Sequence, residues 1–369
     1  MKIENLKDQL QKVSDPRRQW GNLKHKLWEM LIIALFSTMT LGQSYDDMED
    51  FGKANEEWLR EDLGLELKHG TADGDTYERI FNRIKSGELR EYLNASLEIT
   101  REKRGNLVNF DGKTKRGSKS KKAEALHVIS AFATENRIVL GEIKSAKCRT
   151  EKNEIPELIK TLDIEGSIVT TDSIGCYEKT AEAIIEGEAD YVIGLKKNQP
   201  KFHESVENHF KTGVRVYDKE QTVDCGHGRI EIRTYHLETD LSWLADEHKW
   251  AGLTGVGMVT SCTIRDGKTE SSVSRRYYIT SLDNAEDFAY AVREHWGIEN
   301  NLHWCLDVIF REDERRVKNH NAALNLNILD KTALQLINDA DMGKISKRRK
   351  MRNLALNHKL FISSILCEE

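Results

Sequence analysis

The chain has 369 residues, of which 38% are hydrophobic and 32% charged, and its formal net charge is −5 at pH 7. This length and composition suit a soluble globular protein of about two domains with a highly charged surface. The small net charge neither favours nor excludes a nucleic-acid partner, so local clusters of charge carry that information instead.

The spacing of the cysteines and the length of the apolar runs indicate which cellular compartment to expect. The six cysteines are far apart and include no CxxC pair: Cys148, Cys176, Cys225, Cys262, Cys305 and Cys367. A cysteine-type structural zinc site is therefore not expected, and the scatter suits a reducing cytoplasm. The N-terminus is too polar for a signal peptide, and the most apolar run, LWEMLIIALFSTMTLG, contains Glu29 and is too short for a confident membrane span. We expect a cytoplasmic protein with no membrane partner.

Residues 1–100 are predicted to form a helical N-terminal domain. The segment LKHKLWEMLIIALFSTMTLG has helical length and apolar content, and Gly42 would end that helix. Thr71 or Asp73 would cap a later helix in TADGDTYERIFNRI. Short helices without a β pattern indicate a compact module, which could bind DNA or serve packing alone.

From residue 101 the pattern becomes mixed α/β. Three β-type runs (NLVNFDGK, LHVISAFAT, RIVLGEIKS) precede alternating helical and strand segments (NEIPELIKTLD, SIVTTDS, YEKTAEAIIEGE, DYVIGLKK). This order predicts a mixed sheet flanked by helices over 101–212. Four more β-type runs predict a β-rich insertion over 213–283, and residues 284–369 are expected to be helical.

Two aspartates follow core strands of this predicted sheet. Asp111, in VNFDGKTKRGSKSKK, is expected to end one strand before a basic loop, and Asp172, in SIVTTDSIGC, to end another. Acids at strand ends lie on the sheet rim, where open α/β sheets bind ligands. A solvated turn would explain the first acid alone, and a helix N-cap the second.

A third acid lies in AVREHWGIENNLHWCLDVIF, residues 291–310. At helical spacing four side chains form one line: His295, Glu299, His303 and Asp307. The line could belong to a zinc site, a packing surface or the wall of another active site. The HExxH spacing is absent, which disfavours zinc. Packing is the expected role of Trp304 and Val308.

Three carboxylates, Asp111, Asp172 and Glu299, match the oxygen ligands that two Mg²⁺ ions require for phosphoryl transfer. In that chemistry one ion activates the attacking hydroxyl and the other stabilises the leaving oxygen. We expect two Mg²⁺ ions, for which Mn²⁺ would substitute.

Ten motifs together resemble the H-repeat-associated insertion-sequence transposases, a branch of the DDE transposases with a ribonuclease-H-like catalytic core. They are NFDGKTKRGS, LHVISAF, RIVLGEIK, KNEIPELI, IVTTDSIGC, ADYVIGLKKNQ, CGHGRIEIR, RYYITSL, REHWGIENNLHWCLDVIFRED and NAALNLNIL. In this order they extend over nearly the whole chain. The resemblance implies cutting of DNA at the ends of an insertion sequence and joining of 3′-hydroxyl ends to target DNA. It assigns the three catalytic, metal-binding acids to Asp111, Asp172 and Glu299.

The chain departs from a Tyr-Arg-Glu-Lys signature that related DDE branches carry around the third acid. His295 stands at the Arg position, and Leu306 or Asp307 stands near the Lys position. The phosphate contacts of those basic residues would need substitutes, for which the candidates are Arg293, His303 and Arg311.

The expected partner is DNA, both element ends and target, bound by a homo-oligomer that we expect to be a dimer. The residues expected to contact DNA are basic or aromatic: Lys113, Lys115, Arg116, Lys196, Lys197, Arg293, His295, Trp296 and His303. An inactive or domesticated transposase-derived DNA-binding protein is the alternative reading.

Overall fold

The computed structural model describes residues 2–18, 23–97, 106–121, 123–145, 151–212, 218–226, 229–248, 250–265 and 272–366. Contacts between residues divide the chain into two compact units. The helical unit comprises Met1–Lys103, Thr114–Leu126 and Asn300–Glu369, and the sheet unit comprises Arg104–Lys113 and His127–Glu299. The division of the chain into four domains or segments, which the sequence predicted, remains a prediction.

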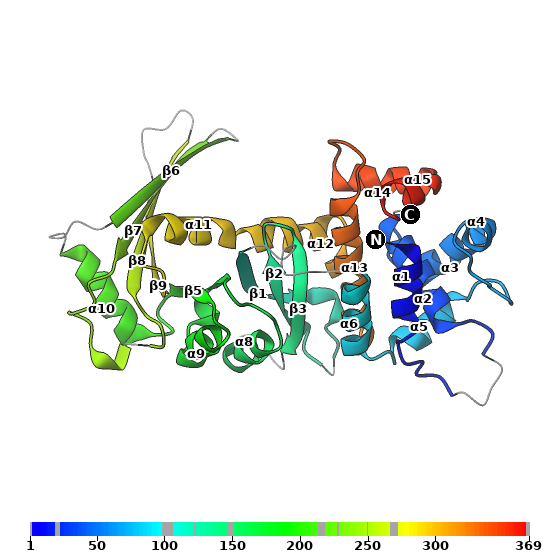
Figure 1. Ribbon diagram of the computed structural model, residues 1–369, viewed down its shortest axis with the longest axis horizontal. Coiled ribbons are helices and arrows are strands. Elements are labelled where there is room, and N and C mark those ends of the chain that lie inside the picture. The colour runs from blue at the N-terminus through cyan, green and yellow to red at the C-terminus, as the bar shows by residue number, and fades with distance from the viewer. Residues whose placement is uncertain are drawn as a thin grey trace. The chain divides into compact units, whose positions relative to one another are not determined.

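Nine strands of the described residues form one mixed sheet in the order β3-β2-β1-β4-β5-β9-β8-β7-β6 (Figure 1). They are β1 (Leu107–Lys115), β2 (Leu126–Ala133), β3 (Ile138–Ser145), β4 (Ile168–Thr171), β5 (Asp190–Leu195), β6 (Asp218–Gly226), β7 (Arg229–Glu238), β8 (Gly255–Arg265) and β9 (Ser272–Thr280). β1, β4 and β5 are parallel neighbours. The order 3-2-1-4-5 of the first five strands is that of a ribonuclease-H-like core, which confirms the predicted fold class.

The β-rich segment after β5 extends this same sheet. β9 pairs antiparallel with β5, opposing Ile279 to Ile193, and β8, β7 and β6 follow outward as antiparallel neighbours. The sequence predicted strands here but not their attachment to β5. Because of this attachment, side chains of β9 lie beside the end of β5, where a cleft opens.

Helices cover both faces of the sheet (Figure 1). The core on one face contains residues of α8 (Glu151–Lys160), α9 (Glu178–Glu186) and α10 (Pro200–Lys211) together with Ile193 of β5. The core on the other face contains Phe288 of α11 (Ala285–His295) together with Val192. Successive strand residues point to opposite faces, so these neighbouring residues of β5 anchor two separate cores. α10 was not predicted from the sequence; it begins with Pro at its first position, where a missing N–H costs nothing.

The helical unit is organised around α13, which is buried along most of its length and contacts α2, α5 and α6. Its helices in the described residues are α1 (Ile3–Leu10), α2 (Leu27–Met39), α3 (Tyr45–Ala54), α4 (Glu56–Glu61), α5 (Gly74–Phe81), α6 (Ser86–Ser96), α12 (Trp304–Val308), α13 (His320–Asp339), α14 (Lys347–Leu356) and α15 (Lys359–Ser364). Asp73 caps α5 by accepting a hydrogen bond from the Thr76 backbone N–H at 2.8 Å. α2 ends at Met39, before the predicted stop at Gly42.

Buried Glu29 has backbone partners. Its Oε1 accepts hydrogen bonds from the backbone N–H groups of Glu66 and Leu67, at 2.8 and 3.3 Å. These bonds account for an acid inside the most apolar run of the chain. Among the described residues, no helix has the length and apolar character needed to cross a membrane.

The segment after Asp111 is not the loop that the sequence predicted. β1 continues to Lys115, and a 3₁₀-helix covers Arg116–Ser118. Lys115 is 5% exposed, its Nζ lies 2.6 Å from Glu312 Oε1, and it donates to the Ala323 carbonyl at 2.8 Å. The expected DNA contact of Lys115 does not fit this position, because its ammonium is enclosed within the helical unit.

We expect Lys115→Met to lower the free energy of unfolding by about 3–5 kcal/mol, because it leaves the Glu312 carboxylate buried without its cation. The neighbouring pair provides a matched control. Arg116 and Asp313 lie 3.7 Å apart with the Arg116 side chain 86% exposed, so Arg116→Met should cost less than about 1 kcal/mol. Urea unfolding measures both, and equal losses would contradict the prediction.

Candidate active site

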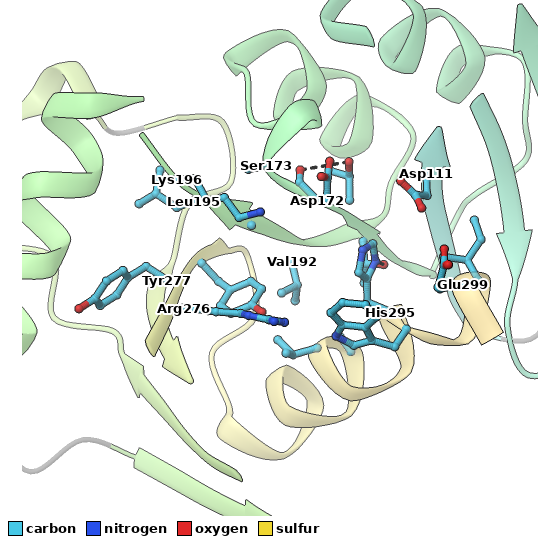
Figure 2. Close-up of a pocket in the computed structure, with 18 of the residues that line it drawn as sticks. Asp111, Asp172, Ser173, Val192, Leu195, Lys196, Arg276, Tyr277, His295 and Glu299 are labelled. Atoms are coloured by element: carbon cyan, nitrogen blue, oxygen red, sulfur yellow. Dashed lines mark hydrogen bonds between the residues drawn. The ribbon is translucent and has the colours of Figure 1, made fainter. Parts of the chain in front are cut away.

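A cleft of about 780 Å³ lies in the sheet unit, next to the ends of β4 and β5. Its lining comes from β1, β4, β5, β9, α10, α11 and the turns that follow β4, β5 and α11. The three acids that the sequence singled out, Asp111, Asp172 and Glu299, all line it (Figure 2). Residues that are far apart in the sequence therefore line the same cleft.

The register between β1 and β4 sets the positions of the two aspartates. Phe110 lies opposite Thr171 in the parallel pairing, so Asp111 and Asp172 are the next residues on the two strands. Asp111 does not end its strand as predicted, because β1 runs on to Lys115. The paired register with β4 does end at Phe110, however, and the cleft opens just beyond that point.

Asp172 begins the turn after β4. Its Oδ1 accepts a hydrogen bond from the Ile174 N–H at 2.8 Å, which caps the 3₁₀-helix Ser173–Gly175. The capping role considered from the sequence is therefore present, although the capped element is this short turn and not α9. Gly194 of β5 lies against the turn, and a Cβ there would come within 3.2 Å of the Ser173 backbone nitrogen. Glycine lets β5 approach the turn that holds Asp172.

The segment that carries Glu299 is not a continuous α-helix. α11 ends at His295, Trp296 is its C-cap, and residues Glu299–His303 form a π-helix before α12 begins. The predicted single line of side chains is therefore wrong, because a turn and π geometry change the angle between successive residues. π-helical turns occur often at functional sites.

Glu299 and Asp111 come close enough to share a cation. Their carboxylate oxygens lie within 4.8 Å of one another, and opposite oxygen ligands of one Mg²⁺ ion are about 4 Å apart. Gly297, two residues before Glu299, packs closely against Thr134, because a Cβ there would lie 2.4 Å from Cγ2 of Thr134. The oxygen donors of Asp111, Glu299 and Asp172 suit a hard divalent cation such as Mg²⁺ or Mn²⁺.

Another part of the cleft lining is cationic. Four basic side chains contribute to it: Lys196, Lys197, Arg275 and Arg276. Leu195 lies opposite Tyr277 in the antiparallel pairing of β5 with β9, which brings the next residues, a lysine and an arginine, beside each other. The two arginines were not among the site residues predicted from the sequence. The signal was the RR pair in SSVSRRYYITSL, but nothing local in the sequence makes β9 the neighbour of β5.

Trp296 adds an aromatic surface to the lining. The residue is 49% exposed, and the Arg276 guanidinium lies 5.2 Å from its ring centroid. An exposed indole beside a cation can stack on a nucleic-acid base. Tyr278 also lines the cleft, and burial raises the pKa of its phenol, so that the hydroxyl stays neutral.

Several predicted DNA contacts do not line this cleft in the described residues: Lys113, Lys115, Arg116, Arg293 and His303. Arg293 pairs with Asp224 of β6 at 2.8 Å, and His303 is 5% exposed. The expectation that Trp304 and Val308 pack is wrong, because they are 53% and 49% exposed.

Comparisons with known proteins identify the family of the chain. The family model "Transposase DDE domain" matches residues 98–336, and the model "DDE_Tnp_1-associated" matches residues 7–95. YncI of Escherichia coli O157:H7, named as a transposase, is 35% identical, with 97% of this chain and 93% of that protein covered. YhhI of E. coli strain K12, named as an H repeat-associated transposase, is 32% identical, with 99% and 98% covered.

A cryo-EM structure of a piggyBac transposase synaptic complex with hairpin DNA covers 100% of this chain and 83% of its own, at 11% identity and a TM-score of 0.41. The domain match extends over more than half of the 369 residues, and the two bacterial relatives match nearly end to end. The chain therefore belongs to the DDE transposases, in their H-repeat-associated branch.

Proposed function

We propose that the chain is the transposase of an insertion sequence, cutting DNA at the element ends and joining 3′-hydroxyl ends to target DNA by two-metal phosphoryl transfer. The observation that supports this best is the convergence of Asp111, Asp172 and Glu299 on one cleft with a cationic lining. Family membership implies the use of divalent metal, and the oxygen-rich donor set favours Mg²⁺, with Mn²⁺ as a substitute.

In this proposal the three acids would hold the ions. Bound ions of this kind lower the pKa of a water ligand and polarise the phosphate. Asp111 and Glu299 supply oxygens within 4.8 Å of each other, and Asp172 supplies charge from the strand adjacent to β1. Neighbouring carboxylates repel one another, and a bound cation would offset that repulsion.

The cationic lining would hold the phosphate backbone. Lys196 and Lys197 are exposed at the end of β5, next to the arginines of β9. Because the whole chain carries a net charge of −5, attraction for DNA has to come from such local patches. Arg116 is exposed but does not line the cleft, and it remains a candidate contact to DNA outside the cleft. We expect a dimer on DNA, since an element has two ends to cut.

The alternative is an inactive or domesticated transposase-derived DNA-binding protein. It is less favoured, because DNA binding alone does not require three carboxylates around one cleft. An assay distinguishes the transposase from the inactive DNA-binding protein. Purified protein is incubated with the DNA that flanks its own coding sequence, in the presence of Mg²⁺ or Mn²⁺. Strand cleavage at the element ends supports the enzyme, and binding without cleavage supports the alternative.

Asp111→Asn, Asp172→Asn and Glu299→Gln should each reduce metal-dependent cleavage by about a thousandfold or more. Each amide keeps the shape of the side chain but removes charge that binds the ion, and metal stabilisation contributes several kcal/mol to the transition state. Cleavage of labelled end DNA measures the loss. Binding of the same DNA without metal is the control and should change little. If a variant cleaves at the wild-type rate, the acid that it replaces is not catalytic.

Lys196→Gln combined with Lys197→Gln should weaken binding to all DNA sequences alike. Each lost phosphate contact lowers the slope of log K against log salt by about 0.9, so loss of both contacts lowers it by about 1.8. Titrations at several salt concentrations measure the slope. Lys179, exposed on α9 and outside the cleft lining, provides the matched control Lys179→Gln, and an equal effect in control and double variant would contradict the assignment.

A further inference from the structure

A chain of buried hydrogen bonds lies behind His295. Asn109 of β1 and Thr170 of β4, 0% and 1% exposed, face each other in the strand register. Thr170 Oγ1 lies 2.6 Å from Asn109 Oδ1 and 2.7 Å from His295 Nδ1. Asn109 Nδ2 lies 2.9 Å from the Glu294 carbonyl and 2.5 Å from Thr134 Oγ1. All five residues belong to the sheet unit.

The Glu294 backbone carbonyl determines which atom donates and which accepts in each of these hydrogen bonds. A carbonyl oxygen only accepts, so the Asn109 atom beside the Glu294 carbonyl is the amide nitrogen, and Oδ1 therefore faces Thr170. Oδ1 also only accepts, so the single hydroxyl proton of Thr170 points to Asn109. The Thr170 oxygen is then an acceptor for His295, whose Nδ1 must carry a proton.

We infer that Asn109 and Thr170 hold neutral His295 as the Nδ1–H tautomer, so that Nε2 serves the substrate as a hydrogen-bond acceptor. The opposite tautomer would require Thr170 to turn its proton to His295, leaving two acceptor oxygens 2.6 Å apart in a buried site. Free neutral imidazole favours the Nε2–H form, so the protein has to impose the other one. Asn109 and Thr170 act as positioning residues.

This tautomer changes the role expected for His295. Phosphate oxygens carry no proton at neutral pH and cannot donate to Nε2, whereas the attacking water or 3′-hydroxyl can. His295 lines the same cleft as the three acids (Figure 2). In its neutral form His295 would therefore orient the hydroxyl nucleophile by accepting its hydrogen bond, a role that rests on the proposed strand cleavage and joining. A contact to DNA phosphate is not its function in the neutral form.

Asn109 also connects these hydrogen bonds to the segment that carries the third acid, Glu299. Its amide lies 2.9 and 3.3 Å from the carbonyls of Glu294 and His295, the last two residues of α11. Carbonyls at a helix end lack partners within the helix, so a buried side chain of β1 satisfies them. The same asparagine thus fixes the end of α11 and the imidazole, one turn before Glu299.

Nuclear magnetic resonance of the full chain with labelled histidine tests the tautomer without any DNA or metal. The ring nitrogen and carbon shifts of a neutral imidazole differ between the two tautomers. The chain has 12 histidines, and His295→Asn identifies the relevant signals by their loss. We expect Nδ1–H in the wild type and in Thr170→Ser, and a shift toward Nε2–H in Thr170→Val. An Nε2–H tautomer in the wild type overturns the inference.

Cleavage and binding assays test the role in the reaction. His295→Asn keeps a donor toward Thr170 but loses the second ring nitrogen, and it should lower cleavage by about 100-fold, the typical cost of a misplaced reacting group. Thr170→Val should cause a similar loss, and Thr170→Ser should restore most of it. DNA affinity and its salt dependence should stay unchanged in His295→Asn, whereas a phosphate contact would lower both.

The outcomes separate the inference from the proposed function. If the wild type cleaves no DNA but shows the Nδ1–H tautomer, the strand-cleavage proposal fails and the hydrogen-bond assignment stands. If the wild type cleaves and His295→Asn cleaves at the same rate, the nucleophile-orienting role is overturned. Thermal unfolding of each variant identifies losses that arise from misfolding, and His295→Asn and Thr170→Ser provide readouts if Thr170→Val does not fold.

Discussion

The parallel pairing of β1 with β4 is the constraint on which the site depends. It places Asn109 opposite Thr170, with Asp111 and Asp172 as the next same-face residues two positions further along each strand. The buried hydrogen bond between Asn109 and Thr170, 2.6 Å long, supports this register. A slip of one residue would turn side chains to the wrong face and bury polar groups without partners. One register therefore positions both aspartates and the support of His295.

Charge in the cleft comes from two parts of the sheet. Two acids follow the pairing of β1 with β4, whereas the basic residues come from the end of β5 and from β9. The β-rich segment is thus part of the site, because without β9 the cleft would lack both arginines. Carboxylates that attract cations and basic groups that attract phosphates can act in one cleft when separate strands carry them. This separation lets a protein with a net charge of −5 present a local surface for DNA.

The path of the chain between His295 and His303 shows how packing overrides local helix geometry. The side chain of Asn109 satisfies carbonyls at the end of α11, and Gly297 lies so close to Thr134 that any Cβ would collide. The π-helical segment that follows carries Glu299 to within 4.8 Å of the Asp111 carboxylate. A regular α-helix would have placed Glu299 at a different angle around the axis.

The sequence alone indicated the strands and most helices of the sheet unit, because β-branched runs, turn residues and caps are local signals. Its motifs also identified the family and singled out three acids that line one cleft. Only the tertiary structure decided which strands are neighbours, that Lys115 is buried with Glu312, that two arginines enter the cleft, and how the protons around His295 are arranged. The protons around His295, for example, depend on hydrogen bonds between residues 61, 125 and 185 positions apart, and local periodicity carries no information about contacts over such distances.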